Sequence, residues 1–106
     1  MKIVFAPEVE DDLFELVEIL VDKGYLGTYG FAISYVEDLV SFIQTNIQKC
    51  IRIKAPSYFH QFGSDLWYIS YQRNANTTWY IFFTQIGDVY WVKYITNNHV
   101  AAHHLR

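Results

Sequence analysis

The segment from Leu66 to His99 constrains the fold of this chain more than any other. It reads LWYISYQRNANTTWYIFFTQIGDVYWVKYITNNH and contains all three tryptophans. Asn74-Ala75-Asn76 and Gly87-Asp88 separate three runs of β-branched and aromatic residues. Turn residues between such runs are typical of consecutive antiparallel strands. We therefore predict a β-meander, with strands near residues 66–73, 77–85 and 88–96.

Two amphipathic helices are predicted ahead of the meander. Pro7 suits the first turn of a helix, where its missing N–H costs no hydrogen bond. Apolar residues recur at helical spacing over residues 8–23, above an acidic outer face. Gly24 is expected to end this helix, and Thr28 is expected to cap a second helix that runs to about Lys49. The short connection predicts an antiparallel helical hairpin.

The remaining segments complete an α+β domain. Lys2–Phe5 is expected to be a first strand that pairs within the sheet of the meander. Residues 50–65 are less regular, with Tyr58–Phe62 as a short edge strand, and the tail 97–106 contains a helical turn. The predicted order is β-α-α-β-β-β in a single domain, residues 1–106, with the helical hairpin covering one face of the sheet.

The last hairpin of the meander predicts aromatic residues on both faces of the sheet. A two-residue turn at Ile86-Gly87 or Gly87-Asp88 sends alternate residues to opposite faces. One face then carries Trp79, Ile81, Phe83, Tyr90, Val92 and Tyr94, and the other carries Tyr80, Phe82, Thr84, Val89, Trp91 and Lys93. One face must pack on the helices. The other is either an exposed aromatic surface or is covered by a partner, and the pattern leaves open which face is which.

Composition excludes several classes of protein. With 52% hydrophobic and 18% charged residues, the chain can bury a core and does not resemble a disordered protein. No apolar run is long enough to cross a bilayer, and no signal-peptide pattern is present, so we expect a cytoplasmic protein without membrane association. The single cysteine, Cys50, excludes an intrachain disulfide framework and a Cys-based zinc site.

Charge is distributed unevenly along the chain. Residues 1–48 carry nine acidic side chains against Lys2 and Lys23, a net charge of −7. Residues 49–106 carry six Lys or Arg against Asp65 and Asp88, a net charge of +4. The overall charge of −3 argues against generic nucleic-acid binding. The acidic charge therefore lies away from the meander in the sequence, so we expect a functional site on the sheet or at its exit, Asn97–His99.

The order of these elements and several local sequences resemble the RelE/ParE toxins of type II toxin–antitoxin systems. The resemblance covers essentially the whole chain. It is carried by the opening IVFAPE, by the aromatic run WYISY, by the strands TWYIFF and VKYI, and by the closing NNH at Asn97-Asn98-His99. It implies the same α+β fold, a cognate antitoxin as partner and a role such as plasmid stabilisation.

The family resemblance implies two activities. RelE-like members cleave mRNA on the ribosome without a metal or cofactor, using a general base, a general acid and cations at the phosphate. ParE-like members instead bind and poison DNA gyrase. Ribosome-dependent members are strongly basic, whereas this chain is acidic overall. A ParE-like activity, a protein-only target, a homodimer or a member that has lost toxicity therefore remain as alternatives to an endoribonuclease.

If the protein is an endoribonuclease, its candidate catalytic residues converge on the sheet. His99 is the best acid or base, because the ordinary pKa of a histidine lies near ~6.5. Arg73 and Lys93 are candidates for phosphate contacts, and Tyr71 or Tyr94 for base stacking or proton donation. The candidate RNA-binding residues are Arg52, Lys54, Asn97 and Asn98.

Each candidate also has a simpler structural explanation. His99 can end the last strand with local hydrogen bonds, Arg73 can be a solvated residue beside a turn, and strand tyrosines usually pack. Arg52 and Lys54 can form a solvated helix end. His99 and His103 have the i, i+4 spacing of a metal pair, but a loose terminal histidine cluster explains it better, and we expect no metal.

Overall fold

The computed structural model describes residues 1–23 and 28–101, which form the mixed α+β fold expected from the sequence. Five strands and two long helices follow one another with a 3-10 helix and a terminal helical turn. In chain order they are β1 (Lys2–Phe5), α1 (Pro7–Asp22), α2 (Tyr29–Asn46), β2 (Ile53–Lys54), η1 (Ser57–Phe62), β3 (Trp67–Asn74), β4 (Thr77–Ile86), β5 (Val89–Asn97) and α3 (Asn98–Ala101).

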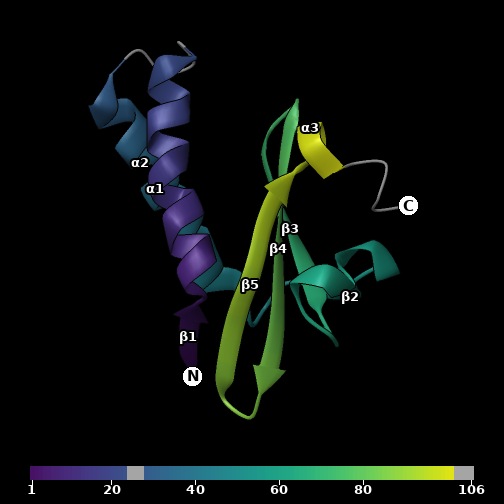
Figure 1. Ribbon diagram of the computed structural model, residues 1–106. Coiled ribbons are helices and arrows are strands. Elements are labelled where there is room, and N and C mark those ends of the chain that lie inside the picture. Colours follow the sequence, from purple (N-terminus) through teal and green to yellow (C-terminus); the bar gives the residue numbers. More distant parts are fainter. Residues whose placement is uncertain (24–27, 102–106) are drawn as a thin grey trace.

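The sheet has the strand order β1-β5-β4-β3-β2. The predicted meander β3-β4-β5 forms its centre, with antiparallel pairing throughout. β1 pairs with β5 in parallel, with Lys2 opposite Val89 and Phe5 opposite Val92. The first strand therefore lies beside the last, at an edge of the sheet, and the chain leaves it directly into α1 (Figure 1).

The two long helices begin as their sequences predict. Pro7 occupies the first turn of α1, and the Thr28 hydroxyl caps α2 by accepting a hydrogen bond from the backbone N–H of Phe31 at 3.4 Å. The predicted end of the first helix at Gly24 lies outside the described residues. α1 and α2 pack side by side on one side of the sheet (Figure 1), which confirms the predicted helical hairpin.

One face of the sheet packs against the helices. Leu39 and Ile43 from α2, the C-cap residue Ile47 and Val9 from α1 meet the sheet residues in a core whose members are almost completely buried. The sheet contributes Ile69, Trp79, Ile81, Phe83, Tyr90 and Val92 to it. The indole N–H of Trp79 donates a 3.0 Å hydrogen bond to the Tyr35 hydroxyl, so the polar edge of this buried ring is satisfied.

The opposite face is covered by the chain's own short segments. Phe59 of η1 is fully buried and stacks on Phe82 with the ring centroids 4.4 Å apart. Phe62 stacks on Tyr94 at 3.8 Å, and Ala101 of α3 is buried in the same cluster. Figure 1 shows η1 and α3 on the side of the sheet away from the helical hairpin. This face therefore has a second core of its own, and only parts of it reach the surface.

Residues 58–62 do not form the predicted edge strand. They belong to the 3-10 helix η1, and the edge strand beside β3 is β2, which pairs Ile53 with Tyr68. Three residues complete one turn of a 3-10 helix, so Phe59 and Phe62 point in the same direction. Both rings are thereby brought onto the sheet, whereas a strand would have placed them on opposite faces.

The predicted face of Tyr94 is also wrong. Phe82 pairs with Tyr94 and Phe83 pairs with Val92, so Lys93 is an extra residue in β5. This β-bulge reverses the alternation of side chains beyond it. Tyr94 therefore lies on the η1 face with Phe82, and Ile95 takes the place on the helix face that alternation assigns to Tyr94.

Among residues 1–23 and 28–101, no helix is long and apolar enough to span a membrane. Burial raises the pKa of the Tyr68 phenol above its ordinary value, with a smaller contribution from the neighbouring Tyr80.

We predict that Phe59→Ala destabilises the protein by about 3–5 kcal/mol, because it empties the centre of the second core. Ile86→Ala is the matched control: Ile86 lies at the exposed tip of the β4–β5 hairpin, and its loss should change stability by about 0.5 kcal/mol or less. Urea unfolding followed by tryptophan fluorescence measures both. Equal effects of the two substitutions would show that η1 does not hold a core.

Candidate partner-binding groove

Arg73 and Tyr71 are the two predicted catalytic residues that the structure brings into direct contact. The Arg73 guanidinium donates to the Tyr71 hydroxyl at 3.3 Å and to the Asp38 carboxylate of α2 at 3.2 Å. It also lies 4.1 Å from the ring centroid of Tyr35, in cation–π geometry. Tyr71 itself stacks on Phe42 of α2. Both side chains therefore join β3 to α2, and the Arg73 side chain is only 18% exposed.

Lys93 and Tyr94 lie at the bulge of β5. The Tyr94 ring is stacked on Phe62. The Lys93 ammonium lies 5.5 Å from the ring centroid of Trp91, and Trp91 pairs with Thr84 on the η1 face. Tyr94 is thus on the face of the sheet opposite to Tyr71 and Arg73.

Arg52 and Lys54 pack on aromatic rings beside the edge strand β2. The Arg52 guanidinium lies between 5.1 and 5.9 Å from the ring centroids of Phe83, Trp67 and Tyr90. The Lys54 ammonium lies 4.9 Å from the Trp67 ring and 3.8 Å from the Asp65 carboxylate. Lys54 therefore covers a ring of β3 next to the edge strand, whereas Arg52 lies over rings contributed by β3, β4 and β5.

Asn97, Asn98 and His99 fasten the start of α3 to the β3–β4 turn. The Asn98 side chain accepts from the backbone N–H of Thr78 at 2.8 Å and donates to the backbone carbonyl of Asn76 at 3.1 Å. His99 Nε2 lies 3.1 Å from the Thr77 hydroxyl. The Asn97 side chain accepts from the backbone N–H of His99. These contacts satisfy the end of the last strand locally.

The contacts group Arg73 with Tyr71, Lys93 with Tyr94, and Arg52 with Lys54. They fix Asn98 and His99 to the β3–β4 turn, which directly follows Arg73 and Asn74 in the chain. His103 lies outside the described residues. Within the part of the chain that the structure describes, no group of three or more His, Cys, Asp or Glu side chains is arranged to hold a metal ion.

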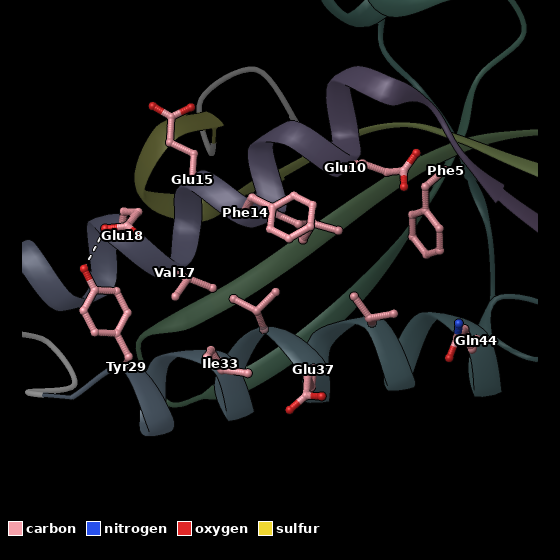
Figure 2. A pocket seen from close by; sticks show the side chains of 13 residues that line it. Phe5, Glu10, Phe14, Glu15, Val17, Glu18, Tyr29, Ile33, Glu37 and Gln44 are labelled. Carbon is pink, nitrogen blue, oxygen red and sulfur yellow. Dashed lines mark hydrogen bonds between the residues drawn. The ribbon is translucent and has the colours of Figure 1, made fainter.

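A large hollow lies between the two long helices. We call it the hairpin groove; it has a volume of about 830 Å³. α1 contributes Leu13, Phe14 and Val17 to its walls, and α2 contributes Ile33, Val36 and Val40. Phe14 is 77% exposed and Ile33 is 46% exposed. Figure 2 shows the Phe14 ring beside the space between the helices, with Val17 and Ile33 facing each other across it. Exposed apolar side chains gathered in one concave place are typical of binding surfaces.

Carboxylates surround this apolar surface. Glu10, Glu15 and Glu18 of α1 and Glu37 of α2 all line the groove. In Figure 2, Glu15 and Glu37 extend away from the space between the helices, one on each outer flank. The groove therefore has an apolar floor and an acidic rim on both sides.

A hydrogen bond joins the two helices at the end of the groove nearest their connection. The Tyr29 hydroxyl of α2 donates to the Glu18 carboxylate of α1 at 2.9 Å (Figure 2). This bond, and then the negative charge of Glu18, raise the pKa of Tyr29 above its ordinary value, with smaller contributions from desolvation and from Asp22. The neutral phenol is thereby favoured beside the acidic rim.

No sequence motif predicts this groove, because an acidic outer face on a helix is most simply explained as a surface in contact with solvent. One signal was present. Phe14 stands outside the apolar stripe of Val9, Leu13, Leu16 and Leu20, and is followed directly by Glu15. A large aromatic residue outside the buried stripe of a helix is exposed to solvent, and an exposed aromatic residue can indicate a binding surface. Its partner Ile33 lies on a different helix, so only the fold brings the two together.

The chain was compared with known protein families, curated proteins and solved structures. No protein-family model, no curated protein and no solved structure matches this chain.

We predict that Glu18→Ala lowers the pKa of Tyr29 towards the ordinary tyrosine value, because both the acceptor and the negative charge are lost. Glu15→Ala should leave it unchanged. NMR titration of ¹³C-labelled tyrosine measures both. In the wild type, the raised pKa means that stability from this contact is present below the pKa of an unfolded tyrosine and is lost as the pH rises through the folded value. An identical Tyr29 pKa in wild type and Glu18→Ala would contradict the assigned contact.

Proposed function

We propose that this protein is a toxin-like protein of the RelE/ParE type that acts by binding another protein through the hairpin groove. The observation that carries the proposal is the groove itself, in which Phe14 and Ile33 expose large apolar side chains beside three carboxylates of α1 and one of α2. Exposing such side chains is costly for a protein that has no partner, because apolar surface is stabilised when it leaves water. The resemblance of the chain to the toxin family supplies the biological setting.

The distribution of cations supports protein binding over RNA cleavage. Metal-free cleavage of RNA needs an acid, a base and cations around one phosphate. Here Arg73 is paired with Asp38 and half-enclosed by Tyr35 and Tyr71. Tyr94 lies on the other face of the sheet from Arg73 and Tyr71. An endoribonuclease built on His99, which contacts Thr77 at the β3–β4 turn, would have to use Arg73 while that guanidinium is paired with Asp38.

Expression in bacterial cells tests the proposal. We expect the wild type to arrest growth without cleaving mRNA, and the double variant Phe14→Ser with Ile33→Ser to lose the arrest, since both side chains line the groove. Growth curves and primer-extension analysis of cellular mRNA are the measurements. His99→Ala should arrest growth as the wild type does.

Phe31→Ser is the matched control for this experiment. Phe31 is also a highly exposed phenylalanine on the helical hairpin, but it does not line the groove. Its replacement should preserve the arrest. The proposal fails if the wild type causes no arrest. It also fails if arrest is accompanied by mRNA cleavage that His99→Ala abolishes and the groove variant retains.

A further inference from the structure

We infer that the occupant of the hairpin groove is a basic amphipathic α-helix of a partner protein. This inference rests on the proposed function, because it names the chemistry of the partner that the groove receives. Three features of the groove carry it: the type of backbone that forms its walls, its length, and its charge.

The walls of the groove select a helix over an extended strand. They are formed by side chains of α1 and α2, and the backbone N–H and C=O groups within a helix already bond to one another. An extended peptide gains affinity by pairing its backbone with the free edge of a sheet, and the helix walls offer no such edge. A segment buried in this groove must therefore satisfy its own backbone, which a helix does.

The dimensions of the groove fit a helix of a few turns. On α2 its lining runs from Tyr29 to Gln44, and on α1 from Glu10 to Glu18. At 1.5 Å per residue, the longer of these walls spans roughly 22 Å. An amphipathic helix of about 15 residues has that length and presents apolar side chains at i, i+3, i+4 and i+7 along one face. Phe14, Val17 and Ile33 would contact that face.

The charge of the helices selects a basic partner. α1 and α2 together contain nine Asp or Glu residues and no Lys or Arg. Asp38 is paired with Arg73 and Glu18 accepts from Tyr29. Glu10, Glu15 and Glu37 remain around the apolar floor, where lysine or arginine side chains flanking a docked helix would complement them.

The same charge disfavours the other occupants of an apolar groove. A second copy of this chain, docked through the same surface, would bring the two acidic rims together. Nucleic acid and anionic lipid surfaces would be repelled by these carboxylates. A partner with an acidic helix would meet like charge on both sides. The basic helix is the occupant whose apolar face and flanks both match.

Three synthetic peptides added to the full-length protein test this inference. The first is a helical peptide of about 15 residues with Leu and Phe on one face and Lys on both flanks, matched to the length of the groove. The second has Glu in place of every Lys, and the third has the residues of the first in scrambled order. Fluorescence anisotropy measures their affinities. We expect the basic peptide to bind at least about tenfold more tightly than the acidic one, and the difference to shrink at high salt.

Variants of the protein separate the two contributions. Phe14→Ser should abolish binding of the basic peptide, and Phe31→Ser should not, because only Phe14 lines the groove. The double variant Glu15→Gln with Glu37→Gln should weaken the basic peptide and strengthen the acidic one. Circular dichroism of each variant checks that its fold is intact.

Four results would overturn the inference. If the acidic and basic peptides bind equally and both require Phe14, the groove still docks a helix and the proposed function survives, but the assigned charge is wrong. If the scrambled peptide binds as well as the basic one, the binding is only electrostatic attraction. If no peptide binds, the occupant is not such a helix. If the protein sediments as a dimer that Phe14→Ser dissociates, the occupant is a second copy.

Discussion

The rest of the structure depends on the burial of β4 on both of its faces. Ile81 and Phe83 are fully buried on one face and Phe82 is fully buried on the other. A strand of this kind cannot lie at a solvent-exposed sheet surface, so the chain must supply cover on two sides. The helical hairpin supplies one cover, and η1 with α3 supplies the second. Consecutive bulky residues in a single strand thereby determine a fold of three layers.

This arrangement explains why the binding surface lies on the helices and not on the sheet. Both faces of the meander are largely used for packing, including the aromatic face that the sequence suggested for a partner. The helices bury one side against the sheet and leave other apolar residues uncovered. Phe14, Ile33 and Tyr29 are therefore available for a partner, and the carboxylates around them set its charge.

The fold was largely predictable because its signals are local. Alternating aromatic runs with turn residues between them predicted β3, β4 and β5, and the period of the apolar residues predicted α1 and α2. Residues 58–62 and the bulge at Lys93 were not predictable in this way. Their conformations depend on the sheet that Phe59 and Phe62 cover and on pairing across β4 and β5.

The candidate site was less predictable for a related reason. Arg73 could be identified as a cation beside a turn and Lys93 as a cation within an aromatic strand, but which face each one uses depends on register. Their engagement with Asp38 and Trp91 depends on packing. The hairpin groove forms only where two helices meet, and Phe14 and Ile33 lie 19 positions apart in the chain. Such a surface becomes visible only when the helices are placed in the fold, because no local sequence motif encodes it.

If the protein functions through the hairpin groove, growth arrest depends on the side chains that line it. A saturation-mutagenesis scan of growth arrest, with the cellular abundance of each variant measured in parallel, measures this dependence. Among positions that are not fully buried and whose variants remain abundant, we expect loss of arrest to concentrate at the groove residues Phe14, Val17, Ile33 and Glu37. Concentration of loss at His99, Arg73 and Lys93, with the groove positions tolerant, would contradict it.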